Sequence, residues 1–412
     1  MRAEIGLWLC VAASGADWPG FRGLGYQGVA PPGDVALAWS ESQNLAWKAA
    51  VPGTGWSSPV VAGGRIFLTT ATEDGVSRRL VCYDSESGRL LWNTEIFRIP
   101  PPHKEEANSY ATSTPVVAGN QVLALFGDGS IAALDFDGKI RWVNRDFKYY
   151  GVHGMGVSPV LSDGLVFVPF DITSEGPDAK VGHTIPWDKS FVIALDWQTG
   201  KLRWKSGRGM SRVAHVTPAV VTVNGREQLV SGAGDWIIGY DAATGRKLWW
   251  LSSKGEGVVP SITLGEGLGF ATSGFGDPAI VAFRIGGEAD VTSSNVVWTH
   301  KKAVPMVASL LAYQGLLYAV TENGIAQALD AKTGDVRWTA RIGGKHFASP
   351  IAAGGRIYFL SQECETTVVE PGREFKVLAT NRLDGTCQAT PAVSAGRIYL
   401  RSKENLYAIG RP

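Results

Sequence analysis

The polar side chains best suited to chemistry stand singly along the chain instead of forming a compact motif. The candidates are Trp56, Asn108, Tyr110, His153, His215, Glu256, Lys301, Lys345 and His346. Histidine and glutamate can transfer protons or ligate metal ions. The chain has no His-x-His or His-x-x-x-His pair, so its histidines could hold Zn²⁺ only if the fold brought distant segments together. We therefore expect no catalytic residue and no metal site, and interpret these side chains as ligand-binding candidates.

The candidates come shortly before repeated strand openings, in which a hydroxyl residue and a proline begin an apolar strand. The openings are Ser58-Pro59, Thr114-Pro115, Ser158-Pro159, Thr217-Pro218, Ser349-Pro350 and Thr390-Pro391, with degenerate copies at Val259-Pro260 and Ser309-Leu310. They recur at intervals of about 40 to 60 residues, and four short strands with their turns fill about 40 to 45 residues. Eight openings predict an all-β, eight-bladed β-propeller with four-stranded antiparallel blades. Because the innermost strands would line the central channel, we expect the candidates to meet at one mouth of it.

A second repeat places Asp, Gly and Trp at a fixed spacing. The copies are Asp84, Gly88, Trp92; Asp196, Gly200, Trp204; Asp241, Gly245, Trp249; and Asp330, Gly334, Trp338, with a shortened copy at Asp135, Gly138, Trp142. Asp supplies a side-chain acceptor and Gly a left-handed backbone position, as tight hairpins require. The Trp falls on the returning strand, where it can wedge between blades. We interpret this repeat as architectural, not catalytic.

The two chain ends predict how the ring closes. After Thr390-Pro391 the chain has room for strands at 396–400 and 405–409 but for no Trp strand, whereas residues 44–48 form a Trp strand with no blade of its own. Pairing the two ends would remove the exposed edges of an open sheet. We therefore expect a signal-like segment at 1–16, an extended segment at 17–43 and one propeller at 44–412. A seven-bladed ring is the alternative, because the units at 259–298 and 349–383 have degenerate second halves.

The composition argues against several classes of protein. The 412 residues include 39 Lys and Arg against 38 Asp and Glu, and 45% of them are apolar. A chain with this balance can build a core and has no excess charge for nucleic acid or an anionic membrane surface. No basic cluster with interleaved aromatic residues occurs, so we expect no nucleic-acid partner.

The repeats also resemble a known superfamily. The segment Ala194-Leu195-Asp196, with Thr199-Gly200-Lys201 and Trp204, looks like the tryptophan-docking repeat of pyrroloquinoline quinone (PQQ) propellers, of the quinoprotein alcohol dehydrogenase-like superfamily. The resemblance runs from about Trp18 to Ile409. Its opening, residues 18–23 (WPGFRG), and the segments 366–369 and 375–379 resemble a group of bacterial PQQ-like propeller proteins. The same fold serves quinoprotein dehydrogenases, an outer-membrane assembly lipoprotein and sensor domains.

The enzymatic branch of that superfamily has features that this chain lacks. Quinoprotein dehydrogenases resemble one another in a vicinal disulfide over PQQ and in carboxylate and amide ligands for Ca²⁺. Here the cysteines are Cys10, Cys82, Cys364 and Cys387, and no two are adjacent. We therefore expect no cofactor, with PQQ and calcium as the alternative. Cys82 follows the pattern of a buried free thiol, whereas Cys364 and Cys387 fall in the last two blades and could form a disulfide.

The N-terminus resembles an export signal. Residues 1–16 carry one early arginine, an apolar run and a small-residue ending, a pattern typical of a short secretory signal and too short to cross a bilayer. The residues before Cys10 do not form a lipid-attachment motif. We expect a periplasmic or otherwise extracytoplasmic monomer without a transmembrane segment.

These inferences favour a non-catalytic binding or scaffold module that holds a protein, a peptide or a small polar ligand at the channel mouth. The alternatives are a PQQ-dependent oxidoreductase acting on alcohols or sugars, and an outer-membrane assembly scaffold. Two long insertions, Phe97 to Tyr110 and Asp171 to Lys189, could cap or recognise something at the ring.

Overall fold

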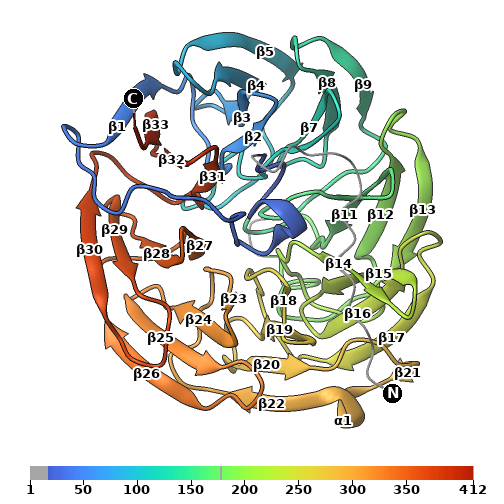
Figure 1. Ribbon diagram of the computed structural model, residues 1–412. Coiled ribbons are helices and arrows are strands. Elements are labelled where there is room, and N and C mark those ends of the chain that lie inside the picture. The colour runs from blue at the N-terminus through green and yellow to red at the C-terminus, as the bar shows by residue number, and fades with distance from the viewer. Residues whose placement is uncertain (1–16, 177–178, 412) are drawn as a thin grey trace.

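The computed structural model describes residues 17–176 and 179–411. Eight antiparallel sheets stand around a central axis, which confirms the eight-bladed propeller and rules out seven blades (Figure 1). The signal-like segment predicted at 1–16 lies outside the described residues. None of the helices in the described ranges is long and apolar enough to cross a membrane.

Each blade runs from an inner strand at the channel to an outer strand at the rim. The strands of the first four blades, from the inside outward, are β2 (Val60–Ala62), β3 (Arg65–Ala71), β4 (Ser77–Asp84) and β5 (Leu90–Arg98); β6 (Val116–Ala118), β7 (Gln121–Leu125), β8 (Ile131–Asp135) and β9 (Ile140–Asn144); β10 (Val160–Ser162), β11 (Leu165–Phe170), β12 (Phe191–Asp196) and β13 (Leu202–Gly207); β14 (Ala219–Val223), β15 (Arg226–Gly232), β16 (Trp236–Asp241) and β17 (Lys247–Ser252).

The second half of the ring repeats the same order. Its strands are β18 (Thr263–Gly265), β19 (Leu268–Thr272), β20 (Ile280–Phe283) and β22 (Val296–His300); β23 (Leu311–Tyr313), β24 (Leu316–Val320), β25 (Ile325–Asp330) and β26 (Val336–Arg341); β27 (Ile351–Ala353), β28 (Arg356–Leu360), β29 (Glu365–Val369) and β30 (Val377–Arg382); β31 (Ala392–Ser394), β32 (Arg397–Arg401), β33 (Asn405–Ile409) and β1 (Leu45–Ala50). The short elements η1 (Leu24–Tyr26), β21 (Ala289–Asp290) and α1 (Thr292–Asn295) lie outside this pattern.

The last blade closes the ring as predicted. Strand β1, from the N-terminal part of the chain, pairs antiparallel with β33, and Lys48 lies opposite Tyr407. The blade that begins with the last opening therefore takes its outermost strand from the start of the propeller, and no edge is left between the first and the last blade.

The core lies between blades, not inside them. One cluster joins Phe167 and Val192 of the third blade to Leu229 and Tyr240 of the fourth. Middle strands such as β8 are buried on both faces, because each sheet is covered by a neighbour on either side, whereas the outer strand β13 buries only its Trp204 fully. This explains why the inner and middle strands are almost continuously apolar.

The hydroxyl residues of the strand openings form a belt of hydrogen bonds from blade to blade. The Ser58 backbone N–H donates to Thr114 Oγ1 at 2.9 Å, and the Thr114 N–H donates to Ser158 Oγ at 3.0 Å. The same contact recurs from Ser158 to Thr217, from Ser261 to Ser309, from Ser309 to Ser349 and from Ser349 to Thr390. These hydroxyls are therefore structural, as expected for repeat positions.

The belt corrects one strand opening. We predicted that the fifth blade opens at Val259-Pro260, but Ser261 occupies the belt position and Ile262 takes the place of the proline. A proline is not required there, because its fixed φ only favours the extended start of the strand. The sequence match to proline misplaced this opening by two residues.

The Trp residues join the blades at the rim. The ring of Trp204 covers Gly245 in the turn of the next blade, where an added Cβ would lie 2.5 Å from the ring, and its Nε1 donates to Ala242 O at 2.9 Å. Trp47, Trp92, Trp142, Trp298 and Trp338 donate in the same way to a carbonyl of the next turn. Trp249 differs, because β21 and α1 replace that turn in the fifth blade, and it donates to Gln228 of its own blade.

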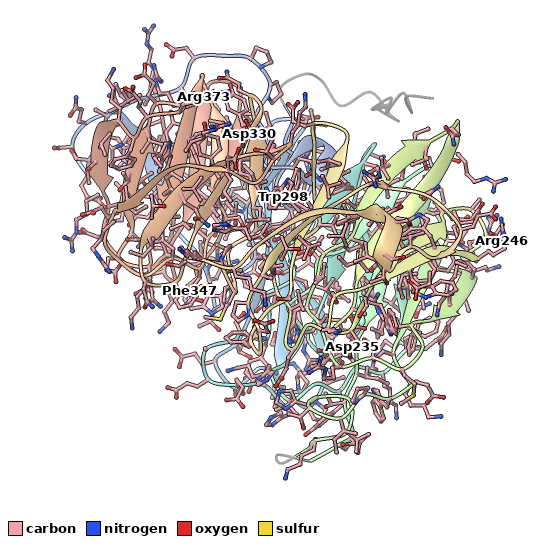
Figure 2. The ribbon with its side chains drawn as sticks, turned by 90° about the horizontal axis from the view of Figure 1, so that it is seen from below. Asp235, Arg246, Trp298, Asp330, Phe347 and Arg373 are labelled. Atoms are coloured by element: carbon pink, nitrogen blue, oxygen red, sulfur yellow. A yellow bond between two sulfur atoms is a disulfide. The ribbon has the colours of Figure 1, made fainter. Side chains whose placement is uncertain are left out.

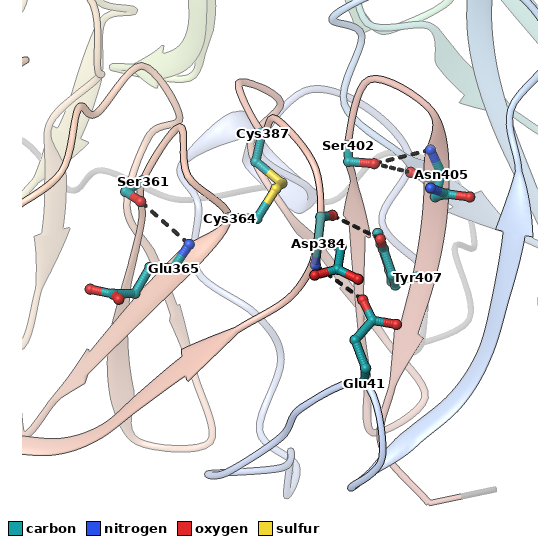
Figure 3. Close-up of a disulfide and its surroundings, with 9 residues drawn as sticks. All are labelled: Glu41, Ser361, Cys364, Glu365, Asp384, Cys387, Ser402, Asn405 and Tyr407. Atoms are coloured by element: carbon teal, nitrogen blue, oxygen red, sulfur yellow. Dashed lines mark hydrogen bonds between the residues drawn. A yellow bond between two sulfur atoms is a disulfide. The ribbon is translucent and has the colours of Figure 1, made fainter.

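A disulfide links Cys364 and Cys387, with 5.1 Å between their Cα atoms (Figure 3). Cys364 lies in the turn between β28 and β29, and Cys387 lies in the connection from β30 to β31. Cys82 is a free thiol that is completely buried, and burial raises its pKa to about 12.

Candidate functional site

The channel holds a cavity of about 1010 Å³, which we call the cup. Its wall carries the eight belt hydroxyls, one from each blade: Ser58, Thr114, Ser158, Thr217, Ser261, Ser309, Ser349 and Thr390. A cavity of this size is at the upper end of the range for small-molecule sites. The closed ring of sheets holds it open, so the site exists before any ligand binds.

The N-terminal segment forms the floor of the cup. It crosses the channel in Figure 1, pairing Trp18 with Val61 of β2 and Val29 with Ala352 of β27. The Val117 N–H of β6 donates to Pro19 O at 2.7 Å, and the ring of Phe21 lines the cup. The motif at residues 18–23 therefore closes the channel on one side and leaves a cup that opens on the other.

Arg22 anchors this floor. Its side chain is fully buried and its guanidinium donates to the backbone oxygens of Leu310 and Gln27, as well as to Thr263 Oγ1 at 3.4 Å. Burial lowers the pKa of Arg22 to about 9. Because these acceptors come from two further blades, the arginine ties the floor to the opposite side of the ring.

Three histidines gather at the open rim. His153 Nε2 lies 3.2 Å from His183 Nε2, and the rings of His153 and His215 are 6.3 Å apart. All three line the cup. Asn108 Nδ2 donates to the His153 carbonyl at 2.8 Å, and Glu105 Oε1 lies 4.0 Å from His153 Nδ1. Residues from two insertions and from two connections between blades thus meet at one place.

Two histidines of the cluster favour the neutral form of the imidazole. Burial, with a smaller contribution from the neighbouring His153 and His183, lowers the pKa of His215 to about 4. Burial and the proximity of His183 also lower the pKa of His153, while Glu105 opposes that shift. Neutral imidazoles can accept hydrogen bonds or bind a cation through nitrogen. His215 Nε2 is buried without a hydrogen-bond partner among the described residues.

Glu256 is held in an ion-pair network on another part of the rim. Arg212 Nη1 lies 3.4 Å from Glu256 Oε2, and Arg212 Nη2 lies 2.7 Å from Asp235 Oδ1. Figure 2, which views the ring from its edge, shows Asp235 and Phe347 towards the lower face and Asp330 and Arg373 towards the upper one. Phe347 and Glu256 both line the cup, so the mouth opens on the lower face in that view.

The structure brings together about half of the side chains predicted for the mouth. Trp56, Asn108, His153, His215 and Glu256 line the cup. The cup lining does not include Tyr110, Lys301, Lys345 or His346.

Each of these four residues has partners elsewhere. Lys301 pairs with Asp277 at 2.6 Å, and the buried ring of His346 contacts the Gly343 and Leu360 carbonyls. Tyr110 packs against Gly75, and the Lys345 N–H donates to Glu363. Closeness in sequence to a strand opening was therefore a poor guide to their position, because the path of each loop decides where its side chains point.

Sequence reasoning missed several residues of the cup. Glu105 and Glu106 come from the first long insertion and His183 from the second, and Phe275, Phe347, Gln362 and Gln388 complete the rim. The length of the two insertions predicts that they could cap the ring. The individual side chains could not be assigned without the course of each loop.

The cup does not match the charge of PQQ. That cofactor carries three carboxylate groups, so a protein site for it needs positive partners. Among the described residues, the lining contains Glu105, Glu106 and Glu256 but no lysine or arginine. The disulfide joins non-adjacent cysteines that are buried away from solvent. In the part of the chain that the structure describes, no group of three or more His, Cys, Asp or Glu side chains is arranged to hold a metal ion.

Known proteins are similar along most of the chain. A family profile described as outer membrane protein assembly factor BamB matches residues 19–145 and 188–411. The outer membrane protein assembly factor BamB of Yersinia pestis is 25% identical over 272 residues, which cover 61% of this chain and 62% of that protein. The quinoprotein alcohol dehydrogenase PedH of Pseudomonas putida is 26% identical over 256 residues, covering 55% of this chain and 41% of that protein. The chain thus spans less than two thirds of these relatives.

Solved structures show the same fold at low identity. BamB from Moraxella catarrhalis superposes with a TM-score of 0.61 at 14% identity, covering 88% of this chain and 96% of that one. Quinohemoprotein alcohol dehydrogenase from Comamonas testosteroni gives 0.61 at 11% identity, covering 96% and 81%. These likenesses establish the PQQ-type propeller fold, and fold alone does not select a function. Because the family profile spans well over half of the sequence, the chain belongs to the family described as outer membrane protein assembly factor BamB.

Proposed function

We propose that this protein is an extracytoplasmic, non-catalytic binding platform whose cup receives a small polar ligand or a peptide segment of a partner protein. The observation that carries this proposal is the cup itself, a cavity of about 1010 Å³ with a closed floor and side chains from all eight blades. A closed ring presents these groups without an ordering cost at the moment of binding.

The lining favours binding over catalysis. The eight belt hydroxyls are repeat positions, six of which accept backbone hydrogen bonds from the neighbouring blade. Glu256, the carboxylate predicted for the mouth, is paired with Arg212, which disfavours a role as a free general base. Aromatic side chains at the floor and rim, Phe21, Phe275 and Phe347, supply apolar contact, and the hydroxyls and amides supply orientation.

An extracytoplasmic location is part of this proposal. The Cys364–Cys387 disulfide is of the kind that persists in oxidising compartments, and the family description refers to outer-membrane assembly. The ring also closes its own sheet edges, which supports a monomer.

Site-specific photo-crosslinking in the periplasm tests the platform. A photoreactive amino acid at Gln388, on the rim of the cup, would crosslink to its partner, whereas the same residue at the exposed Thr339 on outer strand β26 serves as the control. Crosslinks that form from Gln388 and not from Thr339 support the proposal. Equal crosslinking from both positions, or none from the rim together with no small-molecule binding in calorimetry, contradicts it.

The family match favours one second candidate, a scaffold for outer-membrane protein assembly. In that case the species crosslinked from Gln388 would be an envelope protein of the assembly machinery. Titration with PQQ and Ca²⁺ separates both candidates from an oxidoreductase, because saturable binding at one site would favour the enzyme. We expect no binding heat, since the lining offers no positive side chain to the cofactor.

A further inference from the structure

We propose that His153, His183 and His215 form a binding site for a single transition-metal ion of the zinc type at the rim of the cup, with Glu105 orienting His153 from behind. This inference goes beyond the proposed function and does not depend on it, because the ion would bind whether or not the cup holds a ligand. Four of the chain's six histidines lie in this region, since His103 also acts on His153.

The first observation is the spacing of two nitrogens. His153 Nε2 and His183 Nε2 lie 3.2 Å apart. Two imidazole nitrogens bound to one tetrahedral Zn²⁺ at 2.0 to 2.1 Å are separated by about 3.3 Å. In the metal-free protein one of these nitrogens donates the hydrogen bond and the other accepts it, and a bound ion would take the place of the proton between them. The two rings therefore already stand at the separation of a ligand pair.

The second observation is an unsatisfied buried nitrogen. His215 is 8% exposed and its Nε2 has no hydrogen-bond partner among the residues described. A buried polar atom of this kind ordinarily has a partner. Because the His215 ring lies 6.3 Å from that of His153 and borders the same cavity, a turn of its side chain brings a third nitrogen towards the pair. Since the three donors do not yet surround one point, this turn is the change that metal binding must produce.

The third observation is the group behind His153. Glu105 Oε1 lies 4.0 Å from His153 Nδ1. This is the ring nitrogen that does not face His183. The separation from Glu105 is too long for a hydrogen bond, but a small movement of Glu105 would let it accept from the second nitrogen of a ligating His153, a contact that fixes the tautomer and orientation of the ring. The fourth metal position would face the cup, where a water molecule or a polar ligand could occupy it.

Calorimetry with ZnCl₂ on the full chain, after removal of metal by a chelator, tests this site. We expect one ion per chain, and a loss of affinity of at least tenfold in each of His153→Ala, His183→Ala and His215→Ala. Glu105→Gln should weaken binding by about tenfold, as for an outer-shell partner. His300→Ala is the matched control, because His300 lies on outer strand β22, away from the cup, and its ring contacts the Lys302 carbonyl.

Three outcomes of the calorimetry would overturn the proposal. These are the absence of zinc binding, equal affinity in the three single variants and the wild type, or a comparable loss in His300→Ala. Tryptophan fluorescence and thermal unfolding of each variant separate loss of a ligand from loss of the fold. Co²⁺ provides a second readout, because three imidazole ligands give the intense visible bands of tetrahedral cobalt. A weak octahedral spectrum in the wild type would also contradict the three-histidine site.

Discussion

Reducing the Cys364–Cys387 disulfide should destabilise the propeller by an amount that follows from its loop length. The bond spans 23 residues, and closing a loop of that size removes ~11 cal/mol/K of chain entropy from the unfolded state, or about 3.4 kcal/mol at 25 °C. That free energy corresponds to roughly a 300-fold change in the folding equilibrium constant. Both cysteines are buried, so the reductant acts as the chain opens.

Urea unfolding followed by tryptophan fluorescence measures this effect. We expect a lower midpoint in dithiothreitol, and a steeper denaturant dependence because the reduced unfolded chain exposes more surface. The double variant Cys364→Ala/Cys387→Ala is the control, because it should unfold near the reduced wild type and should not respond to dithiothreitol. Coincident curves for oxidised and reduced wild type would refute the reasoning.

The same bond should also stiffen the rim of the cup. Gln362 and Gln388 border the cup and are sequence neighbours of the bridged region, and the Cys387 N–H donates to Gln362 O at 2.9 Å. Figure 3 shows the disulfide beside Asp384, whose carbonyl accepts from Tyr407 of the next blade at 2.8 Å. Hydrogen exchange should therefore accelerate in residues 361–365 and 384–388 after reduction, while β14 to β16 keep their rates.

Four further predictions concern the framework. Trp204→Ala should lower the free energy of unfolding by about 3–5 kcal/mol, as expected when a buried Trp is removed from a core. Gly245→Ala should lower it by about 1–3 kcal/mol, because the φ of Gly245 is +73° and an added Cβ would meet the Trp204 ring. Urea titration of both variants measures these losses, and midpoints equal to that of the wild type would contradict them. Arg208→Ala should lower the free energy of unfolding by about 3–5 kcal/mol in the same assay, because the buried Asp171 carboxylate loses its ion-pair partner. In the wild type, Arg208 Nε lies 2.6 Å from Asp171 Oδ1. A loss below about 1 kcal/mol would show that the ion pair contributes little to stability. Cys82 should resist iodoacetamide at pH 8 in the folded protein and react in urea, because burial raises the pKa of its thiol to about 12. Mass spectrometry measures the labelling. Rapid labelling of the native protein would show that strand β4 opens.

The repeats in the sequence determined the architecture. Turn formers at a fixed spacing in five units give similar local hairpins, and a strand opening in each of eight units predicts eight blades. The unpaired Trp strand at the N-terminus likewise predicted closure, because residues 44–48 had no blade of their own and β33 needed a partner. The pairing of Cys364 with Cys387 was one possibility from sequence, and the Cα separation of 5.1 Å shows it formed.

Only the tertiary structure decided the composition of the cup. The motif at residues 18–23 was recognisable, but its place across the channel floor depends on contacts between Arg22 and two blades, 241 and 288 residues away in the sequence. His183 and Glu105 reach the rim through long insertions, while His346, which stands closer in sequence to a strand opening, turns into the core. Local periodicity determines hairpins, because hairpins are formed by residues that are neighbours in sequence. The cup is lined from eight blades, so its side chains depend on the path of irregular loops. Packing between segments distant in sequence determines that path.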